Sequence, residues 1–334
     1  MSSASFLRKL SALAASIGAA ASLQAAQPAA KASSDAQHPT TASHTDKHTL
    51  ERESLIYTYA PLNLDFEGDF PFLYNDHGAI AAPGGVHLNP NVTLKLWKLV
   101  PINPNTSVTV KSYISSVRRD MAEMAEGRLP KKFQKLYTLQ QEDVRIADLN
   151  IDTLPKQEDK THTGVVYMMS AADRNLYHLQ AIREHLHRVE KSFPSVDAFY
   201  NMPFVLQVVA LDLGYTRKLE GMKCGRAILR LNLDAQNPEF PNKTNRQVLK
   251  DEAYTSSKEK DARRHILRKA LVDAEKLLPN DLPAAYATLL QNLPAGENKL
   301  ADLGYAVMVV NANQNLQKNN QQLIFTGGSN GLTE

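Results

Sequence analysis

Two carboxylates near a pair of glycines are the side chains of this sequence best suited to chemistry. Glu67 is followed directly by Gly68, and Asp76 and Gly84-Gly85 lie further along the same segment. Glycine tolerates a positive φ and a close approach of the backbone. Glycoside hydrolysis uses two such acids, one that protonates the leaving oxygen and one that activates water or attacks the sugar. An ordinary surface turn that carries two acids is the competing interpretation.

No other set of reactive side chains indicates a second chemistry. Cys224 is the single cysteine, which excludes an internal disulfide and a cysteine-based zinc cluster. His178, His185 and His187 belong to one expected helix but lack the four-residue spacing of a helical metal pair. We therefore expect neither a metal nor a cofactor.

The composition is that of a globular protein without a nucleic-acid footprint. The 334 residues are 43% hydrophobic and 22% charged, and 38 basic against 35 acidic residues give a net charge of +3. This balance is too even to predict nucleic-acid binding, whereas a slightly basic chain suits an anionic matrix such as a cell wall. We expect a monomer.

The N-terminal segment is typical of a secretion leader. Arg8 and Lys9 precede an alanine-rich apolar run, which is shorter than the ~20 residues of a membrane span. We expect residues 1–26 to be a leader, residues 27–48 to be a disordered linker, and the protein to be secreted or periplasmic. The alternative is a disordered arm that directs an effector into a secretion machine.

Helices are expected to dominate the chain after a small β region at residues 96–100 and 107–113. Ser170 and Asp173 predict the start of a helix that ends before Phe193-Pro194. The core stripe of this helix is expected to comprise Leu176, Leu179, Ile182, Leu186 and Val189.

The next helix is apolar on nearly every side and should be buried. It covers residues 204–213, with Asn201 as its expected cap and Gly214 as its expected end. Asp212 is a polar exception on this helix, so it needs a partner or must face a cleft.

The last clear helix is amphipathic and begins at the capping box of Ser256 and Glu259. Its basic face is expected to be solvated or to supply ligands for an anionic polymer. Residues 296–334 form an expected Asn/Gln-rich extension. The basic face comprises Arg263, Arg264, Arg268 and Lys269.

The order of these parts resembles the phage-type lysozyme and pesticin-like superfamily of peptidoglycan muramidases. That family opens its domain with a Glu-Gly step, reaches a Tyr-x-Asp step a few residues later, and turns through a glycine-rich hairpin that ends in a Gly-x-His-Leu-like step. The matching stretches of this sequence are Phe66-Glu67-Gly68, Leu73-Tyr74-Asn75-Asp76, Gly78 and Gly85-Val86-His87-Leu88.

The second half of the chain is similar to the same family, though more loosely. Residues 202–215 resemble its central buried helix, and residues 261–274 resemble its closing arginine-bearing helix. The resemblance implies an α+β, mainly α, lysozyme-like fold over residues 49–295, in which a small β-hairpin region precedes a helical bundle around one central buried helix.

The resemblance also implies the reaction, which is cleavage of the β-1,4 bond between the amino sugars of peptidoglycan. Glu67 would be the general acid, partly shielded from water, and Asp76 would orient water or stabilise the oxocarbenium charge. Substrate-binding or water-positioning roles would fall to Tyr74, His87, Asp212 and Arg264.

One departure from the family pattern concerns the attacking water. The family carries a threonine on the hairpin strand two residues before its paired glycines, and this sequence has Ala81-Ala82-Pro83 there. Either another side chain positions the water, with His87 and Thr93 as the nearest candidates, or the protein binds glycan without cleaving it efficiently. A non-enzymatic protein that binds the cell wall or a partner, such as an immunity protein, and an enzyme of unrelated chemistry remain open.

Overall fold

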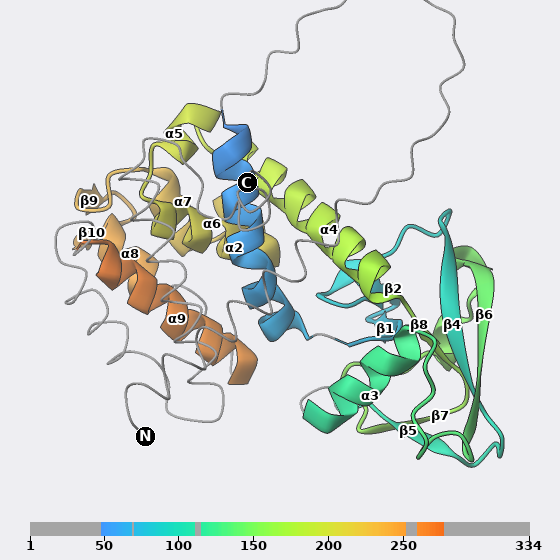
Figure 1. The fold of residues 1–334 in the computed structure, drawn as a ribbon. Coiled ribbons are helices and arrows are strands. Elements are labelled where there is room, and N and C mark those ends of the chain that lie inside the picture. Colours follow the sequence, from blue (N-terminus) through green and yellow to red (C-terminus); the bar gives the residue numbers. More distant parts are fainter. Residues whose placement is uncertain (1–47, 69, 111–114, 252–258, 277–334) are drawn as a thin grey trace, which may run out of the picture. The chain divides into compact units, whose positions relative to one another are not determined.

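The computed structural model describes residues 48–68, 70–110, 115–251 and 259–276 (Figure 1). The chain divides into two compact units, one of residues 59–187 and one of residues 1–58 with 188–334. We call the first the β unit and the described part of the second the helical unit. The mixture of helices and strands confirms the expected α+β class. Apart from His48, the expected leader, linker and C-terminal extension lie outside the described residues.

The described residues of the β unit form three antiparallel sheets. Two have three strands, in the orders β1-β2-β3 and β6-β4-β8, and the third pairs β5 with β7. The expected strands at 96–100 and 107–113 correspond to β4 and β5. The strands are β1 (Tyr74–Asp76), β2 (Ala79–Ala82), β3 (Val86–His87), β4 (Thr93–Pro101), β5 (Ser107–Thr109), β6 (Tyr137–Arg145), β7 (Thr161–Thr163) and β8 (Val166–Met168).

Helices precede, cover and follow these sheets. The helix α2 (Thr49–Glu67) begins in the helical unit and ends in the β unit, and α4 (Ala171–Ser192) runs across the second boundary between the units. The helix α3 (Ser115–Ala125) packs Met121 and Met124 into a core shared with β4, β6 and β8. Two short 3-10 turns, η2 (Ile146–Asp148) and η3 (Ile151–Thr153), follow β6.

The small sheet β1-β2-β3 lies between two hydrophobic clusters of the β unit. Tyr74 and Ala81 belong to the cluster that contains Leu99 and Met168, whereas Ala82 and Val86 belong to the cluster that contains Leu96 and Ile146. Successive residues of a strand point to opposite faces. Both faces of this sheet are therefore packed over part of their area, which fixes the position of the turns that it carries.

The helical unit is built around one apolar helix, α6 (Phe204–Thr216), in which residues 204–213 are all buried. This confirms the expectation that residues 204–213 form a buried helix. The other elements are α5 (Val196–Tyr200), η4 (Leu219–Gly221), α7 (Lys223–Leu229), β9 (Gln236–Asn237), β10 (Phe240–Thr244), α8 (Asn245–Asp251) and α9 (Glu259–Glu275).

Three local expectations for these helices were wrong. Gly214 does not end α6, which continues to Thr216. The missing side chain of Gly214 leaves room for Val189, whose Cγ2 lies 2.2 Å from where a Cβ would stand. Asn201 follows α5 and does not cap α6, whose N-cap is Pro203. On α4, the expected core residue Leu176 is 53% exposed.

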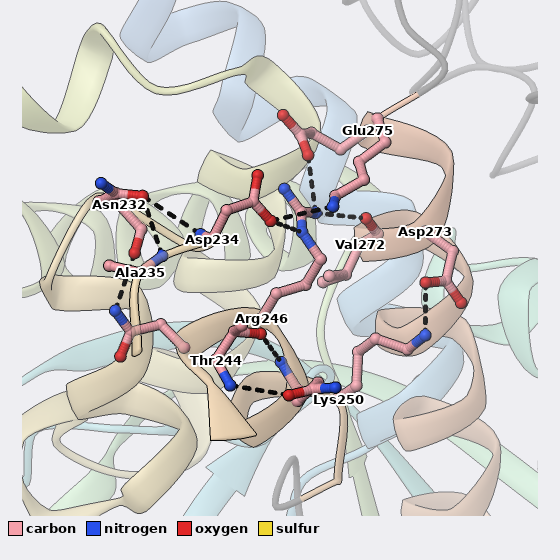
Figure 2. Close-up of polar contacts among 12 residues, drawn as sticks. Asn232, Asp234, Ala235, Thr244, Arg246, Lys250, Val272, Asp273 and Glu275 are labelled. Atoms are coloured by element: carbon pink, nitrogen blue, oxygen red, sulfur yellow. Dashed lines mark hydrogen bonds and ion pairs between the residues drawn. The ribbon is translucent and has the colours of Figure 1, made fainter. Parts of the chain in front are cut away.

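Arg246 joins three segments of the helical unit through polar contacts (Figure 2). Its guanidinium contacts Asp234 at 3.0 Å, Glu275 at 2.8 Å and the carbonyl oxygen of Val272 at 3.0 Å. Lys250 pairs with Asp273 at 2.6 Å on the same two helices, α8 and α9. Because each charge is met by an opposite charge or a carbonyl, this cluster holds α8 and α9 together.

Candidate functional site

Glu67 is the last residue of α2, and the backbone around it is fixed by hydrogen bonds. The N–H of Gly68 donates to the carbonyl of Leu64 at 2.9 Å, and the N–H of Gly84 donates to the carbonyl of Gly68 at 3.0 Å. Gly68 has a φ of +95°, the left-handed conformation that glycine commonly supplies after a helix. The end of the acid-bearing helix is thereby tied to the glycine turn between β2 and β3.

The partly buried carboxylate of Glu67 lies beside Gly85. A Cβ at Gly85 would stand 3.7 Å from Oε2 and from Cβ of Glu67. The missing side chain of Gly85 therefore lets the backbone of the turn lie close to the Glu67 side chain. The paired glycines thus have distinct contacts: Gly84 donates a hydrogen bond to the helix end, and Gly85 lies beside the Glu67 side chain.

Asp76 and His87 form a second polar pair on the outer strands of the small sheet. Asp76 is opposite Ala79, and His87 is opposite Ala81, so the two side chains share a face of β2 with those alanines. The methyl groups are short enough for Nε2 of His87 to reach Oδ2 of Asp76 at 2.9 Å. The His87 side chain is 59% exposed and that of Asp76 is 26% exposed, so the pair faces solvent.

Three buried side chains joined by hydrogen bonds lie beneath the glycine turn. Nε2 of His178, on α4, is 2.9 Å from Oδ1 of Asn63, and Nδ2 of Asn63 donates to the hydroxyl of Tyr59 at 3.4 Å. Because an amide oxygen only accepts, Nε2 of His178 carries the proton of this bond. Burial lowers the pKa of His178 to about 4, so the imidazole is neutral at pH 7.

This hydrogen-bonded set is packed directly against Gly84. A Cβ at Gly84, whose φ is +77°, would stand 2.6 Å from Cδ2 of His178 and 3.3 Å from Oδ1 of Asn63. Asn63 lies one helical turn before Glu67 on α2, so the same helix face carries the acid and the amide. His178 and Asn63 therefore set the distance between the glycine turn and the helix that ends in Glu67.

A loop after β6 supports the site from another side. Nε2 of Gln157 donates to the carbonyl oxygen of Glu67 at 2.8 Å. The N–H of Asn75 donates to the carbonyl of Pro155 at 2.8 Å, and its side-chain amide donates to the carbonyl of Ile151 at 3.3 Å. Residues 151–157 thus bind both the helix end and the strand that carries Asp76.

Tyr74 lies in the same sheet as Asp76 but points into the protein core. It is 1% exposed, and its ring centroid is 5.3 Å from that of Phe70. The structure therefore gives Tyr74 a packing contact in the core of the β unit, and its expected substrate-binding role stays a prediction.

Asp212 and Arg264 belong to the helical unit and bind one another. Oδ1 of Asp212 accepts from Nε of Arg264 at 2.9 Å, and Oδ2 accepts from Nε of Arg268. All three residues are at most 3% exposed. The expected solvated face of α9 is thus buried at Arg264 and Arg268, because Asp212 on the apolar helix α6 attracts both cations. A substrate contact for Asp212 or Arg264 stays a prediction.

Sequence reasoning missed the three side chains that hold the acid-bearing turn, Asn63, His178 and Gln157. Asn63 could have been found through the helix that contains it, since Leu55, Tyr59, Leu62 and Phe66 recur at helical spacing. Gln157 lies in a loop, where no periodicity indicates a contact.

In the part of the chain that the structure describes, no cluster of three or more His, Cys, Asp or Glu side chains is arranged to hold a metal ion. None of the helices among those residues is long and apolar enough to cross a membrane. Comparison of the chain with protein-family models, with curated proteins and with solved structures finds no match.

Proposed function

We propose that this protein is a glycoside hydrolase that cleaves the β-1,4 bond between the amino sugars of peptidoglycan. The observation that carries the proposal is the position of Glu67. Its carboxylate stands at the end of a helix, beside Gly85, and in the same unit as a solvent-facing Asp76–His87 pair. The resemblance of residues 66–88 to the lysozyme superfamily supplies the substrate class.

Glu67 is proposed as the general acid. A general acid has to approach the glycosidic oxygen closely, and the missing side chain of Gly85 allows a sugar to approach the carboxylate. The hydrogen bonds of Gly84 and Gln157 to the backbone of residues 67 and 68 keep this carboxylate in one place. A fixed acid loses little entropy when the substrate binds.

Asp76 and His87 are proposed to handle water as one unit. Oδ2 of Asp76 orients the imidazole through Nε2, as a carboxylate orients a histidine in other catalytic pairs. The exposed imidazole or the other carboxylate oxygen then accepts a proton from the attacking water. This assignment supplies a polar group on the hairpin in place of the family's threonine.

A second candidate function, glycan binding without efficient cleavage, is favoured by Ala82. This residue stands where the family carries its threonine, and it is buried at 1% exposure in the core against Val86. No hydroxyl group is available at that position. Substrate contacts distributed along a cleft would survive the loss of one catalytic group.

The test is an assay of new reducing ends released from purified peptidoglycan, run beside a sedimentation assay on the same walls. Glu67→Gln removes the acid and keeps the shape, and we expect it to lower the rate by about 100-fold or more with binding retained. Asp76→Asn and His87→Gln should each lower the rate, and the double variant should cost no more than the worse single variant if the two act as one unit.

Glu184→Gln is the matched control, because it makes the same change at an exposed glutamate of α4 in the same unit. Full activity of Glu67→Gln would overturn the proposal. Binding to walls by the unmodified protein without any release of reducing ends would favour the second candidate. Absence of both binding and cleavage would contradict both.

A further inference from the structure

The ribbon of β4 and β6 ends in two exposed aliphatic side chains. The register of the ribbon pairs Pro101 with Tyr137, and its next step places Ile102 opposite Leu136. The N–H of Ile102 donates to the carbonyl of Leu136 at 2.8 Å, which continues the ladder. Directly opposed residues point to the same face of an antiparallel pair. Ile102 is 59% exposed and Leu136 is 43% exposed, so they form one apolar pair in solvent.

The chain that leads into this pair is basic. Residues 127–136 carry four cations and no acidic residue. Arg128, Lys131 and Lys135 are exposed, and none of them forms an ion pair with an acidic side chain of the described residues. The fourth cation, Lys132, pairs with Asp120 and lies 5.1 Å from the ring centre of Phe133.

Local hydrogen bonds hold these cations near the apolar pair. The N–H of Phe133 donates to the carbonyl of Pro130 at 2.8 Å, and the N–H groups of Leu136 and Tyr137 each donate to the carbonyl of Phe133 at 2.9 Å. The rings of Phe133 and Tyr137 are 5.9 Å apart and join the core of the β unit. The segment is therefore a run of hydrogen-bonded turns in which the exposed residues Lys131, Lys135 and Leu136 lie close together in the sequence.

We propose that this end of the ribbon docks on the surface of an anionic lipid bilayer. Cations that lack a protein partner are attracted to acidic headgroups, and aliphatic side chains beside them gain free energy when they enter the boundary between headgroups and acyl chains. We call the docking surface the basic tip. It comprises Ile102, Arg128, Lys131, Lys135 and Leu136.

The apolar pair distinguishes a bilayer from other anionic partners. A soluble anionic polymer would be attracted to Lys131 and Lys135 but would gain nothing from exposed Ile102 and Leu136. Nucleic acid is typically bound by basic groups interleaved with aromatic rings, and the rings of Phe133 and Tyr137 are turned into the core. The proposal does not depend on glycan cleavage, because it involves none of the residues near Glu67.

The experiment is sedimentation of the full chain with vesicles. One set contains equal parts of phosphatidylcholine and phosphatidylglycerol, and the other contains phosphatidylcholine alone. We expect binding to the anionic set, weakened by salt, and little binding to the neutral set. Each lost cation should weaken partitioning about fivefold, and each charge reversal should weaken it further.

Two variants and one control separate the contributions. Lys131→Glu with Lys135→Glu should abolish measurable binding, and Ile102→Ser with Leu136→Ser should weaken it about tenfold or more. Lys95→Glu with Lys156→Glu makes the same change of net charge at exposed lysines elsewhere in the β unit and should retain most of the binding. Fluorescence of Trp97, the single tryptophan, checks that each variant is folded.

Three outcomes would overturn the proposal. The first is equal binding to neutral and anionic vesicles, or none to either. The second is an equal loss in the control, which would show that net charge alone matters. The third is full vesicle binding by the Ile102→Ser/Leu136→Ser variant together with release by soluble polyphosphate, which would indicate a site for anionic polymers.

Discussion

The charged groups of the helical unit and those of the candidate site are held in opposite ways. In the helical unit, Asp212 is nearly fully buried and receives guanidinium donors from Arg264 and Arg268. In the β unit, Asp76 and His87 meet only at their tips, and the imidazole is mostly exposed. A buried charge needs partners on every side, whereas a charge that reacts must keep one side open.

The difference lies in what positions each acid. Asp212 is positioned by other charges, so its carboxylate oxygens are occupied by the contacts that stabilise the fold. Glu67 and Asp76 are positioned by the backbone, through a helix end, a short strand and the glycine turn. The Asp76–His87 pair thus stays at the surface, whereas the buried side chains beneath the glycine turn, Asn63 and His178, are neutral.

Removing the charge of Asp212 should produce the largest effect of the variants considered. Asp212→Asn leaves two buried guanidinium groups without their carboxylate, and breaking a buried ion pair costs roughly 3–5 kcal/mol. We expect the free energy of unfolding to fall by that amount in chemical denaturation followed by far-UV circular dichroism. Asp251→Asn is the matched control.

Asp251 pairs with Lys243 at 3.2 Å, and both side chains are largely exposed, at 50% and 40%. Surface pairs contribute about 0–1 kcal/mol, so Asp251→Asn should change stability little. If Asp212→Asn were as stable as Asp251→Asn but bound glycan more weakly, Asp212 would contact the glycan, as proposed for Glu67 and Asp76. The contrast between the two units would then be wrong.

His178 should make the stability of the β unit depend on pH. The unfolded chain protonates this imidazole below about pH 6.5, whereas burial lowers the folded pKa to about 4. Between these values the unfolded state binds more protons, so stability is full above pH 6.5 and falls as the pH drops through the window. The total loss should be roughly 3 kcal/mol.

Denaturation followed by Trp97 fluorescence at several pH values across this window measures the loss, because Trp97 lies on β4 of the same unit. His178→Gln retains an N–H that can bind Asn63 and does not titrate, so its stability should vary less with pH. His77→Gln, at an exposed histidine of the hairpin, is the control. An unchanged pH dependence in His178→Gln would show that other groups cause it.

Strong periodicity predicted the helices α4, α6 and α9, and strand-like residues predicted β4 and β5. The helix α3 and the long strand β6 were not predicted, and the sequence did not indicate the tertiary partners. The helix α6 was predicted because its apolar residues leave no polar face. The pairing of Asp212 with Arg264 and Arg268 was not, because it joins residues more than fifty positions apart. The basic character of α9 indicated a solvated face, and only the packing reveals which cations are buried.

The candidate site shows the same limit. The glycine turn was predicted from residue types and spacing, whereas the helix α2 that carries Glu67 was not predicted. Pro61 lies inside this helix, where proline usually interrupts a helix. His178 was not among the residues expected in the core stripe of α4. It is buried because its imidazole finds Asn63 and Gly84, whereas the apolar Leu176 lies in solvent.

Gly84→Ala should damage the candidate site through its backbone. The new methyl group would meet His178 at 2.6 Å, and the φ of +77° is unfavourable for alanine. We expect a loss of roughly 2–3 kcal/mol in the Trp97 transition and a fall in any glycan cleavage. Gly78→Ala is the matched control: its φ of +91° is similar, but nothing lies within 4 Å. It should lose only roughly 1–2 kcal/mol. Equal losses in the two variants would show that contact with His178 is unimportant.

The smallest effect tests whether a charged cluster depends on geometry or on charge alone. Arg246→Lys keeps the charge but removes the fork that contacts Asp234, Glu275 and the carbonyl of Val272 (Figure 2). Because lysine cannot make several directed contacts at once, we expect a loss of roughly 1–2 kcal/mol in the circular dichroism transition. Lys250→Arg, the reverse exchange at a single ion pair with Asp273, should change stability by less than about 0.5 kcal/mol. If Arg246→Lys changed the free energy of unfolding as little as Lys250→Arg does, the charge alone would suffice to hold α8 and α9 together. The charged groups of the helical unit would then depend on geometry no more than the exposed Asp76–His87 pair does.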